Sequence, residues 1–192
     1  MKIAILGGTG SFGSALAKQL AATDEVVIGS RDADRARVAA EELGVAGATN
    51  EDAVANVDLV VLACPASVAL VTAQSLREAI GTTPVLSVAS ALRVQDDRSI
   101  AEQVADALDA PVAAGLHTVA AATVGGEQDA LVCGDDARAK ELSLELAGRA
   151  VGGRAIDAGP LANARALEGL TGVVVAVNKR YKVHAGVRLT GL

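Results

Sequence analysis

A chain of 192 residues with a hydrophobic content of 51% is long enough to bury the core of one domain. Its net charge of −6 argues against nucleic acid as a partner, and its aromatic content of 1% argues against binding by ring stacking. No apolar run approaches the roughly 18 residues of a membrane span, and the first run, KIAIL, is too short for a secretory signal. We therefore expect a cytoplasmic protein with no membrane partner.

Short apolar runs of strand length alternate with stretches of helical spacing along the chain. The runs are KIAIL (2–6), EVVIG (25–29), DLVVLA (58–63), PVLSV (84–88), APVAAG (110–115), ALVCG (130–134) and RAIDA (154–158). Continuous apolar runs indicate strands buried on both faces, and alternation with helices favours parallel pairing. The sequence therefore predicts one domain over residues 1–192, an α/β fold with a doubly wound, mainly parallel sheet.

The last stretch with helical spacing runs from GPLANARALEGL to Tyr181, with Pro160 near its first turn. It predicts one long helix as a small C-terminal extension of the sheet. Such a helix could pack across the sheet or against a partner chain.

Four glycines lie between the first predicted strand and the first helix, and three of them form the pattern Gly8-x-Gly10-x-x-Gly13. In this position the pattern is a dinucleotide-binding fingerprint. Gly8 permits the tight turn, Gly10 lets a pyrophosphate approach the backbone, and Gly13 allows close packing of helix and strand. The amides at the helix N-terminus hold the negative charge, and the hydroxyls of Thr9 and Ser11 can add donors.

The second strand ends in GSRDADR, where an NAD-binding domain usually presents an acidic residue to the ribose. Ser30 and Arg31 instead suit a 2′-phosphate, and Arg35 lies one helical turn farther on. Asp32 is the competing acidic candidate, but it follows the arginine and fits the N-cap of the next helix. The pattern favours NADP over NAD.

The segment VVLACPAS runs from a strand into a loop at the carboxyl edge of the sheet. Cys64 and Pro65 are expected to line the nicotinamide side of a bound dinucleotide, although Pro65 would serve equally well to start the next helix. The two cysteines, Cys64 and Cys133, are too few and too isolated for a zinc site or a disulfide framework, and we expect no metal.

No residue pattern for acid–base or nucleophilic catalysis is present, and we expect no catalytic side chain. The chain has two histidines and no Ser/His/Asp order. Hydride transfer between two bound cofactors requires alignment more than proton transfer, so this absence is compatible with redox chemistry. His117, in AGLHTVAA, could orient a carbonyl or a ring nitrogen, or could be a loop histidine bonded to the backbone.

Several segments together carry a resemblance to a known family. They are MKIAILGGTGSFG, VVIGSRDADRA, AGLHTVAA, LVCGDDARAKEL, AIDAGPLANARALEGLT and the closing GVRL. The chain resembles the NADPH-dependent F420 reductases, also called F420-dependent NADP oxidoreductases, over nearly its whole length. LHT, CGDD and DAGPL followed by N-x-R are the more specific of these motifs.

The resemblance implies hydride transfer between NADP(H) and the deazaflavin coenzyme F420, and it implies a homodimer. By position, Thr9, Gly10, Ser11 and Phe12 match the phosphate turn, Ser30, Arg31 and Arg35 match the 2′-phosphate site, and Leu116, His117 and Thr118 match a segment near the redox pocket. Residues from about 111 to 192 would complete the second-substrate pocket.

The sequence departs from the family in two loops that are shorter than usual, after PVLSVAS and after LHTVAAA, and in Ala120, where proline is common. Two alternatives therefore stay open. One is an NADPH-dependent reductase of another acceptor, a flavin or a ferric chelate. The other is an NADP-binding protein without catalytic activity.

Overall fold

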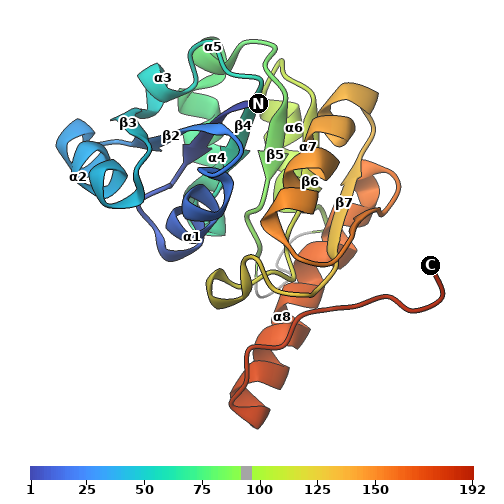
Figure 1. Ribbon diagram of the computed structural model, residues 1–192. Coiled ribbons are helices and arrows are strands. Elements are labelled where there is room, and N and C mark those ends of the chain that lie inside the picture. Colours follow the sequence, from blue (N-terminus) through green and yellow to red (C-terminus); the bar gives the residue numbers. More distant parts are fainter. Residues whose placement is uncertain (92–96) are drawn as a thin grey trace.

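Figure 1 shows the computed structural model, which describes residues 1–91 and 97–192 as one eight-stranded sheet flanked by helices. The strands are β1 (Lys2–Leu6), β2 (Glu25–Ser30), β3 (Ala46–Thr49), β4 (Leu59–Leu62), β5 (Val85–Ser87), β6 (Val112–Gly115), β7 (Ala130–Gly134) and β8 (Ala155–Asp157). Their order is β3-β2-β1-β4-β5-β6-β7-β8, and each neighbouring pair is parallel except β6 with β7. The chain turns in opposite directions on the two sides of β1, which places the switch point between β1 and β4.

Helices cover both faces of this sheet. One face carries α1 (Ser11–Leu20), α2 (Ala33–Leu43) and α7 (Ala137–Ala150). The other carries α3 (Asn50–Ala53), α4 (Ala66–Ser75), α5 (Arg77–Ile80) and α6 (Ile100–Ala107). The predicted doubly wound α/β fold with a mainly parallel sheet is confirmed.

The side chains of β1 show why the apolar runs are continuous. Ile3 and Ile5 are buried in the core on the side of α1 and α7, whereas Ala4 and Leu6 are buried on the side of α4 and α6. Successive side chains of a strand point to opposite faces, so a strand covered on both sides needs an apolar residue at every position.

Strand β3 was not among the predicted strands. Its sequence, AGAT, has a single β-branched residue, Thr49, and no aromatic residue, and the strand lies half-buried at the edge of the sheet. Gly47 allows α2 to lie directly on this strand, because a Cβ at Gly47 would come within 2.5 Å of the carbonyl oxygen of Ala36. This packing depends on contacts that β3 makes with α2 and β2 in the folded chain, and the residues of β3 alone did not reveal it.

The predicted C-terminal helix is present as a short 3-10 turn, η2 (Leu161–Asn163), followed by α8 (Ala164–Tyr181). Figure 1 shows that the first turns of α8 lie against the body of the protein and that its second half extends beyond it. No helix in the described parts of the chain combines the length and the apolar character needed to cross a membrane.

Glu168 attaches α8 to the start of α6. Its side chain is buried, and its carboxylate accepts hydrogen bonds from the backbone amides of Ile100 at 3.0 Å and Ala101 at 3.1 Å. Burial raises the pKa of Glu168, and the two amide bonds act in the opposite direction. A carboxylate here also meets the favourable end of the α6 dipole.

We expect Glu168→Gln to lower the free energy of unfolding by about 1–2 kcal/mol, because an amide replaces one of the two acceptor oxygens with a donor that faces a backbone N–H. Urea denaturation at neutral pH measures this loss. Glu42→Gln, at an exposed position of α2, is the matched control and should stay within about 0.5 kcal/mol of the original chain. Equal losses in the two variants would contradict the role of Glu168.

The segment after α8 runs back from the end of the helix (Figure 1), and its last residues contact an ion pair between a buried carboxylate and a partly exposed guanidinium. The carboxylate of Asp129, which is fully buried, lies 2.7 Å from the guanidinium of Arg154 and accepts a 2.8 Å hydrogen bond from the amide of Leu189. Arg154 also donates to the carbonyl oxygens of Leu189 and Leu192. The hydrogen bond from Arg154 holds the pKa of Asp129 well below its usual range, so this anchor is charged at neutral pH.

Candidate functional site

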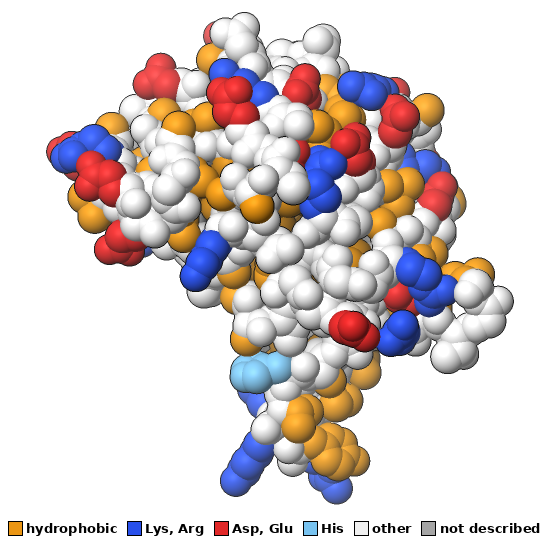
Figure 2. Space-filling view, in the orientation of Figure 1, with side chains coloured by type: hydrophobic (Ala, Val, Ile, Leu, Met, Phe, Trp, Pro, Cys, Tyr) orange, Lys and Arg blue, Asp and Glu red, His pale blue; other side chains and the backbone are white. Residues whose placement is uncertain are grey.

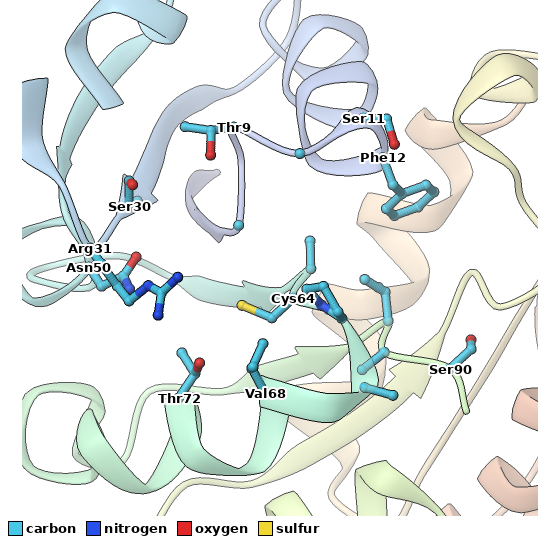
Figure 3. A pocket seen from close by; sticks show the side chains of 18 of the residues that line it. Thr9, Ser11, Phe12, Ser30, Arg31, Asn50, Cys64, Val68, Thr72 and Ser90 are labelled. Carbon is cyan, nitrogen blue, oxygen red and sulfur yellow. The ribbon is translucent and has the colours of Figure 1, made fainter. Parts of the chain in front are cut away.

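A cavity of about 500 Å³ opens at the carboxyl ends of β1, β2, β4 and β5, beside the switch point of the sheet (Figure 3). Nine of the residues predicted for the site line it: Thr9, Gly10, Ser11, Phe12, Ser30, Arg31, Arg35, Cys64 and Pro65. Ligands of open α/β sheets bind at this position.

The glycine turn leaves the N-terminus of α1 open to the cavity. Gly10, the N-cap residue of α1, has no side chain with which to cap the helix, and the first turn of α1 contains no acidic residue. A Cβ at Gly10 would meet only the carbonyl oxygen of Gly7, at 3.3 Å, so the space above the turn is free. Exposed amides and the positive end of a helix dipole fit a pyrophosphate.

Gly8 and Gly13 lie beneath the turn and do not line the cavity. A Cβ at Gly13 would come within 2.5 Å of the carbonyl oxygen of Gly7, and one at Gly8 within 2.5 Å of the Ile28 side chain. Both glycines therefore serve the packing of the turn against the first helix and the second strand, whereas Gly10 leaves room for a ligand.

Two arginines form one end of the cavity. Arg31 and Arg35 are exposed there, and neither makes an ion pair within the part of the chain that the structure describes. The carboxylate of Asp32 accepts a 3.1 Å hydrogen bond from the amide of Arg35, so Asp32 is the N-cap of α2, as expected. Its own amide donates to the Ser30 hydroxyl at 3.2 Å. This end offers cationic groups, not a free carboxylate, and it fits a 2′-phosphate better than ribose hydroxyls.

Cys64 lies along the middle of the cavity (Figure 3). Pro65 follows it in the loop between β4 and α4 and also lines the cavity. The carbonyl oxygen of Pro65 accepts the amides of Val68 and Ala69, so Pro65 begins α4 and lines the cavity at once. Burial raises the pKa of the Cys64 thiol, which is therefore protonated at neutral pH. Cys133 is a buried hydrophobe in β7, and burial raises its pKa to about 11.

Ser90 lies at the end of the cavity opposite Arg31 (Figure 3). Leu116, His117 and Thr118 are buried behind it and do not line the cavity themselves. The Nδ1 atom of His117 lies 2.9 Å from the Ser90 hydroxyl, so His117 reaches the cavity through Ser90. Within residues 1–91 and 97–192 its ring makes no hydrogen bond to the backbone. Burial lowers the pKa of His117 to about 4, and the imidazole is neutral at pH 7.

The sequence did not single out the remaining residues that line the cavity, among them Gly29, Asn50, Val68, Thr72, Val88, Ala89 and Ser90. Gly29 lies in β2, and the others follow β3 or β5 or lie on α4. The rule that ligands bind at the carboxyl ends of parallel strands points to the residues after PVLSV and could have found Ser90. Asn50 could not be predicted as a lining residue, because the strand before it, β3, was not recognised in the sequence. Among the described residues, no three His, Cys, Asp or Glu side chains are grouped to hold a metal ion.

A doubly wound sheet, a glycine turn at an open helix N-terminus and a cationic rim define an NADP-binding α/β protein. Comparison with known proteins narrows this class. The family model described as "NADP oxidoreductase coenzyme F420-dependent" matches residues 2–91. The F420-dependent NADP reductase of Methanothermobacter thermautotrophicus is 38% identical over an alignment that covers all of this chain and 96% of that protein. That of Methanocaldococcus jannaschii is 34% identical, with 100% and 99% covered.

A solved structure assigned as an F420-dependent NADP reductase from Arthrobacter sp. FB24 superimposes with a TM-score of 0.87 at 25% identity, and both chains are covered completely. The chain belongs to the family of F420-dependent NADP reductases. The predicted family, the class of NADP-dependent oxidoreductases and the pair of cofactors, NADP and coenzyme F420, are thereby confirmed.

Proposed function

We propose that this chain transfers a hydride between NADP(H) and coenzyme F420, with the cavity of Figure 3 as its NADP site. The observation that carries the proposal is the extent of the similarity. Two F420-dependent NADP reductases align with all of the chain, including the C-terminal part beyond the dinucleotide-binding half. A shared dinucleotide fold alone would not support a particular second substrate.

Within this proposal, different residues of the cavity bind different parts of the dinucleotide. The amides at the start of α1, with Thr9, Gly10, Ser11 and Phe12, would hold the pyrophosphate, and Gly8 and Gly13 would shape the turn. Ser30, Arg31 and Arg35 would hold the 2′-phosphate, and Cys64 and Pro65 would lie along the nicotinamide side. Residues from about 111 to 192, including Leu116, His117 and Thr118, would complete the pocket for coenzyme F420 within a single domain.

The two cofactors supply the hydride and its acceptor, and the chain supplies their alignment. The passage of a hydride between two rings does not itself require a side chain that moves a proton, and the proton that completes the reduction of the deazaflavin can be taken from solvent. The protein's contribution is therefore proximity and orientation. A neutral His117 and a protonated Cys64 agree with this, because neither presents a charge near the cavity at pH 7.

A spectroscopic assay tests the function. The protein is mixed with NADPH and oxidised coenzyme F420, and we expect the deazaflavin absorbance to fall; with reduced coenzyme F420 and NADP+ we expect it to return. Nucleotide binding is measured separately by titration. Bound NADPH with an unchanged deazaflavin spectrum would contradict coenzyme F420 as the partner.

The same assay should also be run with a flavin or a ferric chelate as the acceptor. The alignment with the relative from Methanothermobacter thermautotrophicus spans 222 positions against 192 residues in this chain, so this chain is shorter within the aligned region. One of the two loops expected from the sequence to be shortened includes residues 92–96, which lie outside the described residues. Turnover with a flavin or a ferric chelate but none with coenzyme F420 would identify a reductase of another acceptor.

We also propose that the protein is a cytoplasmic homodimer. Val173, Val177 and Tyr181 are spaced four residues apart on α8, and their side chains are exposed. Figure 2 shows hydrophobic side chains on the part of the molecule that extends from the body. Such a stripe of exposed apolar side chains indicates a helix that packs against another surface. Two free thiols, Cys64 and Cys133, agree with a reducing compartment.

Light scattering after gel filtration tests the homodimer. We expect the mass of two chains for the original protein and of one chain for Val177→Lys, because a charge would be buried without a partner. Val38→Lys, at an exposed position of α2, is the matched control and should remain a dimer. A single-chain mass for the unchanged protein would contradict the proposal.

A further inference from the structure

Ser90 lies at the cavity end opposite the arginines and is bonded to two residues distant in the sequence (Figure 3). Its hydroxyl oxygen lies 2.9 Å from Nδ1 of His117 and 3.1 Å from the hydroxyl of Thr171, on α8. The Thr171 hydroxyl also lies 2.8 Å from the backbone carbonyl oxygen of His117. The three residues therefore form a closed ring of polar contacts beside the cavity.

The position of each hydrogen atom follows from counting donors and acceptors. A hydroxyl has one hydrogen and two lone pairs, whereas a carbonyl oxygen can only accept. The single hydrogen of Thr171 therefore goes to the carbonyl of His117, at the shorter of its two distances. The Thr171 oxygen is left as an acceptor for the hydrogen of Ser90.

The same count selects the tautomer of His117. With a hydrogen on Nδ1, the ring donates to Ser90, Ser90 to Thr171, and Thr171 to the carbonyl of His117, so every hydrogen is used. The buried Nε2 atom, which has no partner among the described residues, is then a bare acceptor. The other tautomer would leave a buried N–H without an acceptor, and buried N–H groups without partners are rarer than unpartnered acceptors.

This arrangement leaves Ser90 with one free lone pair and no hydrogen to donate. A ligand that bonds to Ser90 must therefore bring its own donor. The nicotinamide ring of NADP carries one in its carboxamide NH2 group. We propose that Ser90 accepts a hydrogen bond from this carboxamide and so orients the nicotinamide ring, while Thr171 and His117 hold the serine hydroxyl in place.

The inference rests on the proposed NADP site, and a binding measurement tests it without coenzyme F420. The probes are NADP+ and its 3-acetylpyridine analogue, which replaces the carboxamide with a methyl ketone that has no N–H. We expect the original protein to bind NADP+ about 3- to 10-fold more tightly than the analogue. Ser90→Ala should bring this ratio close to one.

Ser11→Ala is the matched control, because Ser11 lines the cavity beside the start of α1. Ser11→Ala should weaken the binding of both nucleotides by the same factor, so the ratio of their dissociation constants should not change. A ratio that survives in Ser90→Ala would overturn the role of Ser90. If the ratio is lost as expected but coenzyme F420 is not reduced, Ser90 keeps its role and only the proposed second substrate fails.

The tautomer is tested in the protein without nucleotide by 15N NMR of the histidine rings. His184→Gln, at an exposed position, assigns the signals of His117. We expect a proton on Nδ1 of His117 in the original protein and in Thr171→Ser, which keeps the hydroxyl. In Thr171→Val the Ser90 hydroxyl loses its acceptor and donates to Nδ1 of His117 instead, so we expect the ring proton to shift toward Nε2. A proton on Nε2 in the original protein would overturn the hydrogen-bonded ring.

Discussion

Replacing Arg31 with glutamate is expected to weaken the binding of NADPH by about one to two decades and to leave the binding of NADH nearly unchanged. Arg31 is exposed at the cavity end that carries Ser30 and Arg35, and it makes no ion pair among the described residues. Its guanidinium is therefore available for charge-assisted hydrogen bonds to a 2′-phosphate, which NADH lacks. A carboxylate in its place would also repel that phosphate.

Arg37→Glu is the matched control for this substitution. Arg37 lies on α2, does not line the cavity, and already pairs with Asp34 and Glu41. Titration of each variant with NADPH and NADH gives the two dissociation constants. An equal loss for both nucleotides in Arg31→Glu would show that Arg31 does not contact the 2′-phosphate, and a large loss in Arg37→Glu would point to a general effect of charge.

The second large effect is on stability and comes from His117. Burial holds the pKa of this side chain at about 4, against an ordinary value of 6.5. Between these two values the unfolded chain binds a proton that the folded chain does not, so the free energy of unfolding falls as the pH is lowered. We expect His117 to account for a loss of about 3 kcal/mol from pH 7 to pH 4, with no further loss below the folded pKa.

His117→Asn isolates this effect, because the asparagine amide can keep a hydrogen bond to Ser90 but cannot titrate. The measurement is urea denaturation of both proteins at a series of pH values. At neutral pH the free energy of unfolding of the Asn variant is expected to be lower, because the substitution removes ring volume from a buried position. Between pH 6.5 and 4 its free energy of unfolding should change less with pH than that of the original protein. Parallel profiles would show that His117 takes up its proton in the folded protein as readily as in the unfolded chain.

Features that depend on neighbours in the sequence were predictable from the sequence. The alternation of strands and helices follows from local apolar spacing. The glycine turn is recognisable because its glycines, the strand before it and the helix after it are contiguous. Asp32 is an N-cap through a bond to an amide three residues away. The sequence by itself therefore determined the doubly wound fold and the candidate phosphate-binding end of the cavity.

The opposite end of the cavity was decided only by the tertiary structure. The Ser90 hydroxyl meets His117 and Thr171 across 27 and 81 positions of sequence, and Glu168 meets the amide of Ala101 across 67. The residues next to Ser90 or Glu168 in the sequence do not indicate any of these partners. Strand β3 likewise exists because α2 and β2 lie against a segment with little strand propensity of its own. A side chain that acts through distant partners acquires its role only when folding brings those partners within hydrogen-bonding distance.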